Sequence, residues 1–311
     1  MKRVELRPAR PRLRRASRAL GWTAAGAALG ASALAGFTAW TISGPKRPWP
    51  PYTFTPFEIG MDAEDVRFTS SDGVRLAGWW FEDPDADTVV ICCHGHRGGK
   101  DEMLGIGPGL RRAGHSVLLF DFRGSGESAD GPQSLAFHEQ ADLRAAVDWV
   151  RRRRPDAHIA VVAFSMGAAT ALLTAADDDR IEALVLDSPF ATMSDVIAAN
   201  YRRYHLPFTR LIPLADGATW LRYGYRFAQV RPVDAIARVA PRPILLLHGT
   251  DDRVVPYEHA LQLVNAAQPG AVELVTFEGV DHCGGYFADR LGYIARVDAY
   301  LRRVLTAGRA R

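Results

Sequence analysis

A serine at the junction of a strand and a helix is the strongest chemical signal in the sequence. Residues 158–170 read His-Ile-Ala-Val-Val-Ala-Phe-Ser-Met-Gly-Ala-Ala-Thr, a β-branched run that ends at Ser165 and leads into an alanine-rich stretch. Ala163 and Gly167 are small, as a sharp strand-to-helix turn requires, because larger side chains would collide across it. The turn lifts the hydroxyl out of the backbone, and the helix directs its N-terminus at the same point. This spacing predicts that Ser165 is a nucleophile.

A carboxylate and a histidine follow later strands, so that serine, acid and histidine occur in that order along the chain, each at a strand end. Asp252 comes after the apolar run Ile244–Leu247, and His282 comes after the run Val272–Phe277. A serine hydroxyl is a weak nucleophile at neutral pH, so a neutral imidazole must accept its proton and a carboxylate must fix the imidazole tautomer. We therefore predict a triad of Ser165, Asp252 and His282.

Two backbone N–H groups near the serine are the predicted donors to the tetrahedral oxyanion. Met166 follows the serine directly, and His96 lies in the glycine-rich loop 94–99, which follows the apolar run Thr88–Cys93. Each preorganised donor of this kind lowers the barrier by roughly 3–4 kcal/mol. Together these groups predict attack on an ester, thioester or amide through an acyl-enzyme.

Other titratable residues nearby offer alternatives. Asp251 is the second choice for the acid, and Asp187, at the end of another apolar run, is a further choice. His248 fits a packed position at a strand end better than it fits the base. His94 and His96 suggest a metal pair, but no third ligand is evident. We predict no metal and no cofactor.

Alternating strands and helices must position these groups. The sequence predicts a hairpin over Asp65–Thr69 and Arg75–Phe81, and a helical insertion between Phe190 and Pro241 that covers the site. Further strands are expected over Thr88–Cys93, Ser116–Phe120, Ile159–Phe164, Ile181–Leu186, Ile244–Leu247 and Val272–Phe277, and helices over Asp101–Ala113, Phe137–Arg153, Pro256–Ala267 and Tyr286–Leu305. Such alternation predicts a mostly parallel central sheet with helices on both faces, whose site lies at the carboxyl ends of the strands.

These segments together resemble the α/β-hydrolase fold family. The family's Gly-x-Ser-x-Gly elbow is present as Ala-Phe-Ser-Met-Gly over 163–167, with alanine at the first position. Its acid motif, His-Gly-x-x-Asp-x-x-Val-Pro, corresponds to 248–256 and maps its aspartate onto Asp252. Residues 121–128 resemble the family's turn after the fourth strand. The resemblance covers about residues 62–305 and implies an α/β-hydrolase domain like those of bacterial membrane-anchored serine aminopeptidases and esterases.

A stretch without charges near the N-terminus predicts a transmembrane helix. Residues 19–42 carry no charged side chain, and eight Lys or Arg residues precede them. At about 1.5 Å per residue this stretch is long enough to cross a hydrocarbon layer of about 30 Å. The basic flank predicts a single-pass protein of the cell membrane with a cytoplasmic N-terminus and the catalytic domain outside. Two alternatives stay open: a cleaved signal peptide, since Ala33-Leu34-Ala35 resembles a cleavage site, with secretion of the enzyme, and an amphipathic or disordered tail.

The predicted domain organisation follows from composition. A basic tail (1–18), the transmembrane or signal segment (19–42) and a proline-rich linker (43–61) precede an α/β-hydrolase domain (62–307) with a cap insertion (190–241). The first fifty residues hold ten basic residues and one acidic residue, whereas the remaining 261 hold 28 basic and 34 acidic residues. The folded part is therefore mildly acidic, which argues against a nucleic-acid partner.

The predicted function is hydrolysis of a carboxylic ester or related acyl bond of a small-molecule substrate. An aminopeptidase or an acyltransferase with the same triad is the alternative within enzymes. A membrane-tethered binding module without activity is the alternative from another class. The sequence specifies neither the acyl length nor the oligomeric state.

Overall fold

The buried apolar runs assemble into an eight-stranded sheet. The computed structural model describes residues 11–44, 49–203 and 209–307, and its strand order is β1-β2-β4-β3-β5-β6-β7-β8. Strands β1 and β2 and strands β2 and β4 pair antiparallel, and the other pairs are parallel. The strands are β1 Glu64–Thr69, β2 Arg75–Phe81, β3 Thr88–Cys93, β4 Ser116–Phe120, β5 His158–Phe164, β6 Ile181–Asp187, β7 Ile244–Gly249 and β8 Val272–Phe277. The prediction of a mostly parallel sheet is confirmed.

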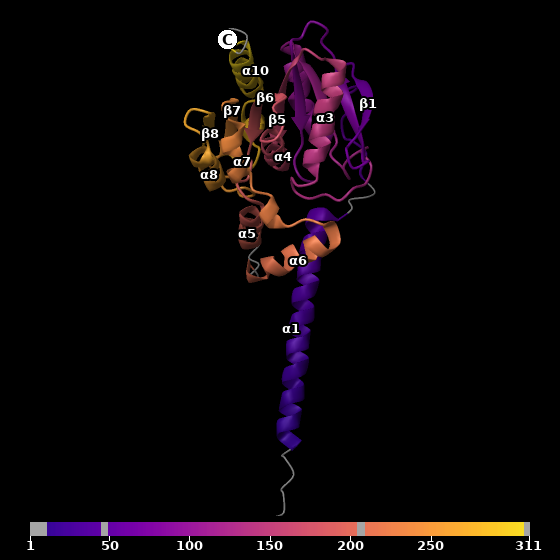
Figure 1. Ribbon diagram of the computed structural model, residues 1–311, viewed down its shortest axis with the longest axis vertical. Coiled ribbons are helices and arrows are strands. Elements are labelled where there is room, and N and C mark those ends of the chain that lie inside the picture. The colour runs from indigo at the N-terminus through magenta and orange to yellow at the C-terminus, as the bar shows by residue number, and fades with distance from the viewer. Residues whose placement is uncertain (1–10, 45–48, 204–208, 308–311) are drawn as a thin grey trace, which may run out of the picture.

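Helices cover both faces of this sheet, and other helices, α1 among them, lie beyond one end of it (Figure 1). The α-helices are α1 Pro11–Ser43, α2 Gly107–Arg112, α3 Glu139–Arg153, α4 Met166–Ala175, α5 Met193–Arg203, α6 Ile212–Tyr223, α7 Pro232–Val239, α8 Glu258–Ala266, α9 Gly285–Ala288 and α10 Arg290–Ala307. Short 3₁₀ turns lie at η1 Lys100–Gly105, η2 Thr209–Leu211 and η3 Phe227–Gln229.

The apolar core lies on both faces of the sheet because the central strands are buried on both sides. Successive side chains of a strand point to opposite faces. In β3, Val89 and Ile91 join the core that also includes α3, α4, α7 and α8, whereas Val90 and Cys92 join the core that includes α2 and α10. This double burial explains why these strands read as continuous apolar runs rather than as alternating ones.

Two predicted helices are each divided in the structure. The helix predicted over 101–113 is a 3₁₀ turn followed by α2, because Pro108 cannot donate a backbone hydrogen bond and glycines flank the break. The helix predicted over 286–305 is divided into α9 and α10 at Asp289, whose backbone is extended. The Asp289 side chain accepts a hydrogen bond from the Gly292 N–H at 2.9 Å and so caps the start of α10.

Helices α5 and α6 lie at the end of the molecule from which α1 extends (Figure 1). Helix α7, within the same insertion 190–241, packs instead on α4 and α8 beside the sheet. Helix α6 ends at Gly224, whose φ of +78° gives the left-handed terminus that glycine adopts without strain. The insertion boundaries stay a prediction, and residues 204–208 lie outside the described part of the chain.

The N-terminal helix α1 runs away from the body over most of its length (Figure 1). Its segment Trp22–Ser43 is long and apolar enough to cross a membrane by length and composition. Its last turns are buried in the body, however, where α1 packs against α6 and Ala35, Thr38 and Ala39 are covered. Of the predicted basic tail, residues 1–10 lie outside the described part.

The segment predicted as a linker also contacts the body. The Tyr52 hydroxyl donates to Asp121 at 2.5 Å and accepts a hydrogen bond from the Lys100 ammonium at 2.8 Å. The Tyr52 ring packs against Trp79, and Ile59 packs on the apolar core. Part of the segment 43–61 is therefore bound along the domain surface.

Candidate active site

Ser165 occupies a strained turn between β5 and α4. Its φ of +51° and ψ of −115° lie outside the regions that non-glycine residues usually adopt. The turn is held from both sides, because the Ser165 N–H donates to the Asp187 carbonyl at 2.8 Å and its carbonyl accepts from the Ala169 N–H at 3.0 Å. Strain of this kind persists only where the surrounding structure enforces it, and it is common at functional sites.

The small residue after the serine is required by the neighbouring strand. A Cβ atom at Gly167 would lie 2.5 Å from the His94 carbonyl oxygen and 2.6 Å from the Cys93 carbonyl oxygen. The first turn of α4 thus passes directly over the end of β3. Ala163, on the other side of the turn, is fully buried. The contact with β3 accounts for the small residue at position 167.

The structure brings Ser165, His282 and Asp252 into one hydrogen-bonded row. His282 Nε2 lies 2.9 Å from Ser165 Oγ, and His282 Nδ1 lies 2.7 Å from Asp252 Oδ2. The Asp252 side chain is fully buried, and the His282 side chain is 19 % exposed. An imidazole in this position can accept the serine proton on one ring nitrogen while the other donates to the carboxylate.

Backbone groups hold the Asp252 carboxylate in place. Its Oδ1 accepts hydrogen bonds from the N–H groups of Val254 and Val255 at 2.9 and 2.8 Å, which leaves Oδ2 facing His282. Burial alone would raise the pKa of the Asp252 carboxyl. Hydrogen bonds from His248, His282 and the Val255 N–H outweigh burial and hold that pKa well below its usual range. The carboxylate therefore stays ionised.

Close contact between two loops places His282 beside Asp252. The loop after β7 meets the loop after β8 where the Asp251 N–H donates to the Val280 carbonyl at 3.1 Å. A Cβ atom at Gly249 would lie 2.1 Å from that same carbonyl oxygen, so only glycine permits the approach. Asp281 completes the link, since it accepts from the His282 N–H at 2.8 Å and pairs with Arg253.

The alternative acids and base lie in other environments. Asp251 is exposed, and its side chain receives a long contact of 3.4 Å from Thr250. Asp187 is buried and accepts from Tyr293 and from its neighbour Ser188. Burial raises the pKa of Asp187 to about 6, although both hydrogen bonds lower it.

His248 and His94 have structural partners. His248 Nε2 lies 2.8 Å from the Val255 carbonyl oxygen and 3.3 Å from Asp252 Oδ2, so this ring packs behind the carboxylate. His94 is fully buried, which lowers the pKa of its imidazole. Its Nε2 accepts from the Phe122 N–H at 3.0 Å, and its Nδ1 lies 2.7 Å from the Gly95 carbonyl oxygen. Both His94 ring nitrogens are therefore engaged within the protein, which leaves neither for a metal.

Comparison with known proteins places this geometry in a family. The family described as alpha/beta hydrolase fold matches residues 88–211, and the family described as TAP-like protein matches residues 216–306. The uncharacterized protein YqkD of Bacillus subtilis is 30 % identical over 251 residues, which cover 79 % of this chain and 82 % of that protein. The chain belongs to the α/β-hydrolase superfamily. The predictions of this fold and of a hydrolase are confirmed.

Relatives of this hydrolase include proteins named for acyl chemistry. The structure of the Pyrococcus furiosus esterase Pf2001 superposes with a TM-score of 0.68 at 25 % identity, over 84 % of this chain and 98 % of the esterase. The lysophosphatidylserine lipase ABHD12 of Macaca fascicularis is 28 % identical over 204 residues, which cover 61 % of this chain and 48 % of the lipase.

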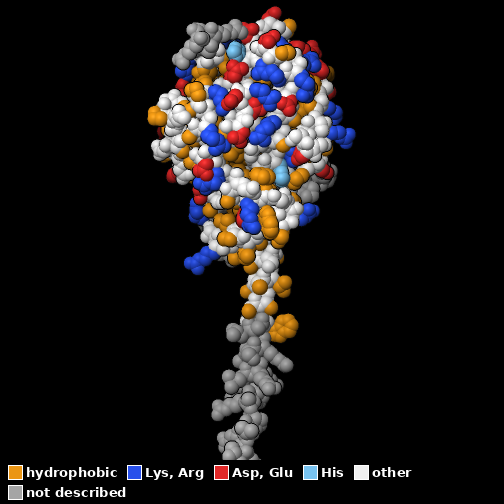
Figure 2. All heavy atoms as spheres, viewed as in Figure 1, with side chains coloured by type: hydrophobic (Ala, Val, Ile, Leu, Met, Phe, Trp, Pro, Cys, Tyr) orange, Lys and Arg blue, Asp and Glu red, His pale blue; other side chains and the backbone are white. Residues whose placement is uncertain are grey.

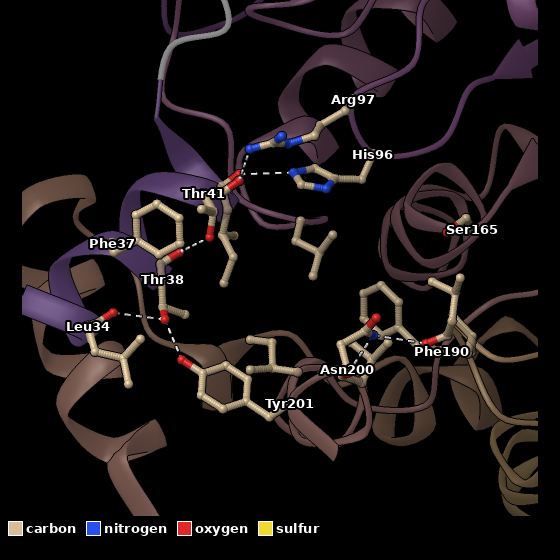
Figure 3. A pocket seen from close by; sticks show the side chains of 16 residues that line it. Leu34, Phe37, Thr38, Thr41, His96, Arg97, Ser165, Phe190, Asn200 and Tyr201 are labelled. Carbon is tan, nitrogen blue, oxygen red and sulfur yellow. Dashed lines mark hydrogen bonds between the residues drawn. The ribbon is translucent and has the colours of Figure 1, made fainter. Parts of the chain in front are cut away.

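A largely apolar cavity of about 460 Å³ opens beside Ser165 in this α/β hydrolase (Figure 3). His96 lies in the loop after β3, where the sequence predicts an oxyanion donor, and it lines this cavity. Met166 is the first residue of α4, where backbone N–H groups lack acceptors within the helix. The assignment of both N–H groups to an oxyanion hole stays a prediction. The other lining residues are Leu34, Phe37, Thr38, Thr41, Ile42, Arg97, Leu135, Phe190, Val196, Ile197, Asn200, Tyr201, Val254 and Val255.

The contribution of α1 to this cavity is what sequence reasoning missed. Five of the lining residues belong to the last turns of the helix that was predicted to serve as a membrane segment. The threonines Thr38 and Thr41 near the end of α1 are the available signal. The Thr38 hydroxyl bonds to Tyr201 of the body, whereas the Thr41 hydroxyl donates to the Thr38 carbonyl of the same helix. By themselves such residues also suit a helix in lipid.

Proposed function

We propose that this chain is a serine hydrolase that cleaves carboxylic esters through an acyl-enzyme. The support comes above all from the row of contacts Asp252–His282–Ser165, at 2.7 and 2.9 Å, beside a largely apolar cavity. Two of the similar proteins carry names that describe ester hydrolysis: one is an esterase and the other is a lysophosphatidylserine lipase. An ester is preferred over an amide because its alkoxide leaves with less help than an amine.

In the proposed reaction, Ser165 Oγ attacks the ester carbonyl carbon while His282 Nε2 takes the hydroxyl proton. The N–H groups of His96 and Met166 stabilise the oxyanion of the tetrahedral intermediate. Collapse of this intermediate breaks the bond to the alcohol oxygen, which receives the proton from His282. Water then attacks the acyl-enzyme by the same route and releases the carboxylic acid. Asp252 remains ionised and keeps His282 in the productive tautomer.

A substrate panel together with an active-site probe tests this function. We expect p-nitrophenyl esters to be hydrolysed at least tenfold faster than aminoacyl nitroanilides, with water as acceptor rather than an added alcohol or amine. A fluorophosphonate is expected to label one residue, and peptide mapping should place the label on Ser165. Preference for the nitroanilides would favour the aminopeptidase, and acyl transfer in preference to hydrolysis would favour the acyltransferase. Intact folding without turnover or labelling would favour a binding module.

The acid limb of the pH profile is expected to reflect a single ionisation. Because the folded-state pKa of Asp252 is depressed, its stabilising charge is present above the unfolded-state pKa and is lost only as the pH falls through the depressed value. Asp252 therefore adds no ionisation near neutral pH, so log kcat/KM should rise with a slope of one rather than two between about pH 5 and 7. Initial rates on a short ester in a pH-stat measure this slope.

Asp187 supplies the control for that profile, since burial raises its pKa to about 6, within the same range. Its hydrogen bonds go to Tyr293 and Ser188, so Asp187→Asn should leave the slope at one. A slope of two in the natural protein that falls to one in this variant would contradict the single-group account.

A further inference from the structure

The last turns of α1 form one wall of the cavity beside Ser165. Figure 3 shows Leu34, Phe37 and Thr38 across the cavity from Ser165. Apolar side chains of α5 form the wall next to them, among them Ile197. Phe37 lines the cavity and is nonetheless 59 % exposed, so the cavity opens beside this residue. A ligand that fills the cavity therefore touches the N-terminal helix.

Hydrogen bonds fasten this end of α1 to the body. The Thr38 hydroxyl bonds to the Tyr201 hydroxyl of α5, and the Ser43 hydroxyl bonds to the Tyr225 hydroxyl at 2.8 Å. The last carbonyl groups of a helix have no backbone N–H donor within the helix. Here the carbonyl of Thr41 accepts from Arg97 at 2.7 Å.

The neighbouring carbonyl of α1 contacts the loop after β3. His96 Nε2 lies 3.0 Å from the Ile42 carbonyl oxygen, and His96 is the residue whose backbone N–H is assigned to the oxyanion. The end of α1 thus contacts both the cavity beside Ser165 and the loop after β3, which contains the predicted oxyanion donor His96.

The length of the uncharged part of α1 determines how far the cavity would lie from the hydrocarbon layer of a membrane. Sixteen residues without a charged side chain, from Ala19 to Leu34, precede the level of the cavity. At about 1.5 Å per residue they extend for about 24 Å, which is less than a hydrocarbon layer of about 30 Å. For α1 to span such a layer, the hydrocarbon must reach the turns that contain Leu34, Phe37 and Thr38. The opening of the cavity then lies at the membrane surface.

Helix α6 supports the same placement. It packs against α1 and lies across it (Figure 1), so it runs along the membrane surface when α1 crosses the membrane. Leu214, Trp220 and Leu221 of α6 are exposed, and Arg226 stacks on the Trp220 ring. Exposed apolar and aromatic residues with a neighbouring cation are typical of interfacial helices. Figure 2 shows hydrophobic side chains on the surface where α1 leaves the body.

We propose that α1 is a substrate-binding element: the acyl chain of a single-chain ester enters from the membrane beside Leu34 and Phe37 and lies between α1 and α5, with its carbonyl carbon at Ser165. The volume of about 460 Å³ falls within the range of small-molecule sites. This inference rests on the proposed esterase function. It also requires α1 to remain attached, since cleavage after Ala35 would remove Leu34 from the wall.

A matched pair of tryptophan variants tests the inference in the full-length protein. Leu34→Trp places an indole at the opening of the cavity, whereas Leu29→Trp makes the same change five residues earlier, where Leu29 is 72 % exposed and does not line the cavity. Both proteins are reconstituted in phosphatidylcholine vesicles, and intact mass verifies that α1 is present. Initial rates are measured with p-nitrophenyl butyrate and with p-nitrophenyl palmitate dissolved in the vesicles.

We expect Leu34→Trp to lower kcat/KM for the palmitate at least tenfold and for the butyrate less than twofold, and Leu29→Trp to change neither. Leu34→Ala, which removes contacts without crowding, should raise KM for the palmitate about fivefold and leave the butyrate unchanged. Equal chain-length dependence in all three variants and the natural protein would overturn the proposal, as would a mature protein that lacks α1. Failure of the natural protein to hydrolyse the butyrate would instead refute the esterase function itself.

Discussion

Replacing Ser165 by alanine is expected to reduce kcat by about 10⁴- to 10⁶-fold and to leave KM within a few-fold of its original value. The hydroxyl lies 2.9 Å from His282 Nε2 and is the atom that forms the acyl bond in the proposed reaction. Its loss removes the covalent route, whereas the cavity that binds the substrate stays intact. Steady-state kinetics with p-nitrophenyl butyrate measure both constants, and fluorophosphonate labelling should disappear in parallel.

Ser188→Ala is the matched control for this change. Ser188 also follows a strand, has a φ of +52° and lies near the site, but its hydroxyl donates to Asp187 and accepts from the Cys283 N–H. We expect this variant to keep its kcat within tenfold of the original and to label normally. Ser165→Ala protein that retains more than about 1 % of the activity would indicate a different nucleophile, provided that labelling also survives.

The sheet and the row of polar groups were predictable because the signals are local and strong. The run 159–164 is β-branched and apolar, Gly167 is small, and parallel strands place the residues after them at one edge. The β3 and β8 bounds match those observed, and the fold prediction is confirmed. The breaks at Pro108 and Asp289 were missed because apolar spacing continues across both, although a proline inside a helical pattern is a known signal for a break.

The contact of α1 with the body and with the cavity was not predictable from its composition. An apolar helix face suits lipid and a protein core equally, and hydropathy alone does not separate them. The burial of Ala35 and Ala39 depends on where α6 and α5 lie, and these helices come more than 150 residues later in the chain. Small side chains at these positions permit close approach of α6, but they also lower the hydropathy that suggested a membrane segment. Contacts between such distant segments carry no local signature.

Replacing Asp252 by asparagine is expected to lower kcat about 10⁴-fold at pH 7 with little change in KM. The N–H groups of Val254 and Val255 both donate to Oδ1, so the asparagine carbonyl oxygen must take that position and its NH₂ group must face His282. His282 Nδ1 then becomes the acceptor, and its proton moves to Nε2, which faces Ser165. An imidazole in that tautomer cannot take the serine proton. Kinetics on p-nitrophenyl butyrate, with circular dichroism to verify folding, measure the effect.

Asp251→Asn makes the identical chemical change at the adjacent residue and should alter kcat less than twofold, because that side chain is exposed. Asp187→Asn should lower kcat less than tenfold, since Asp187 hydrogen-bonds to Tyr293 and Ser188. A loss of 10³-fold or more in Asp187→Asn with activity retained in Asp252→Asn would transfer the role of the acid to Asp187. The comparison is decisive because all three variants replace one carboxylate oxygen with an amide nitrogen, so their differences arise from position alone.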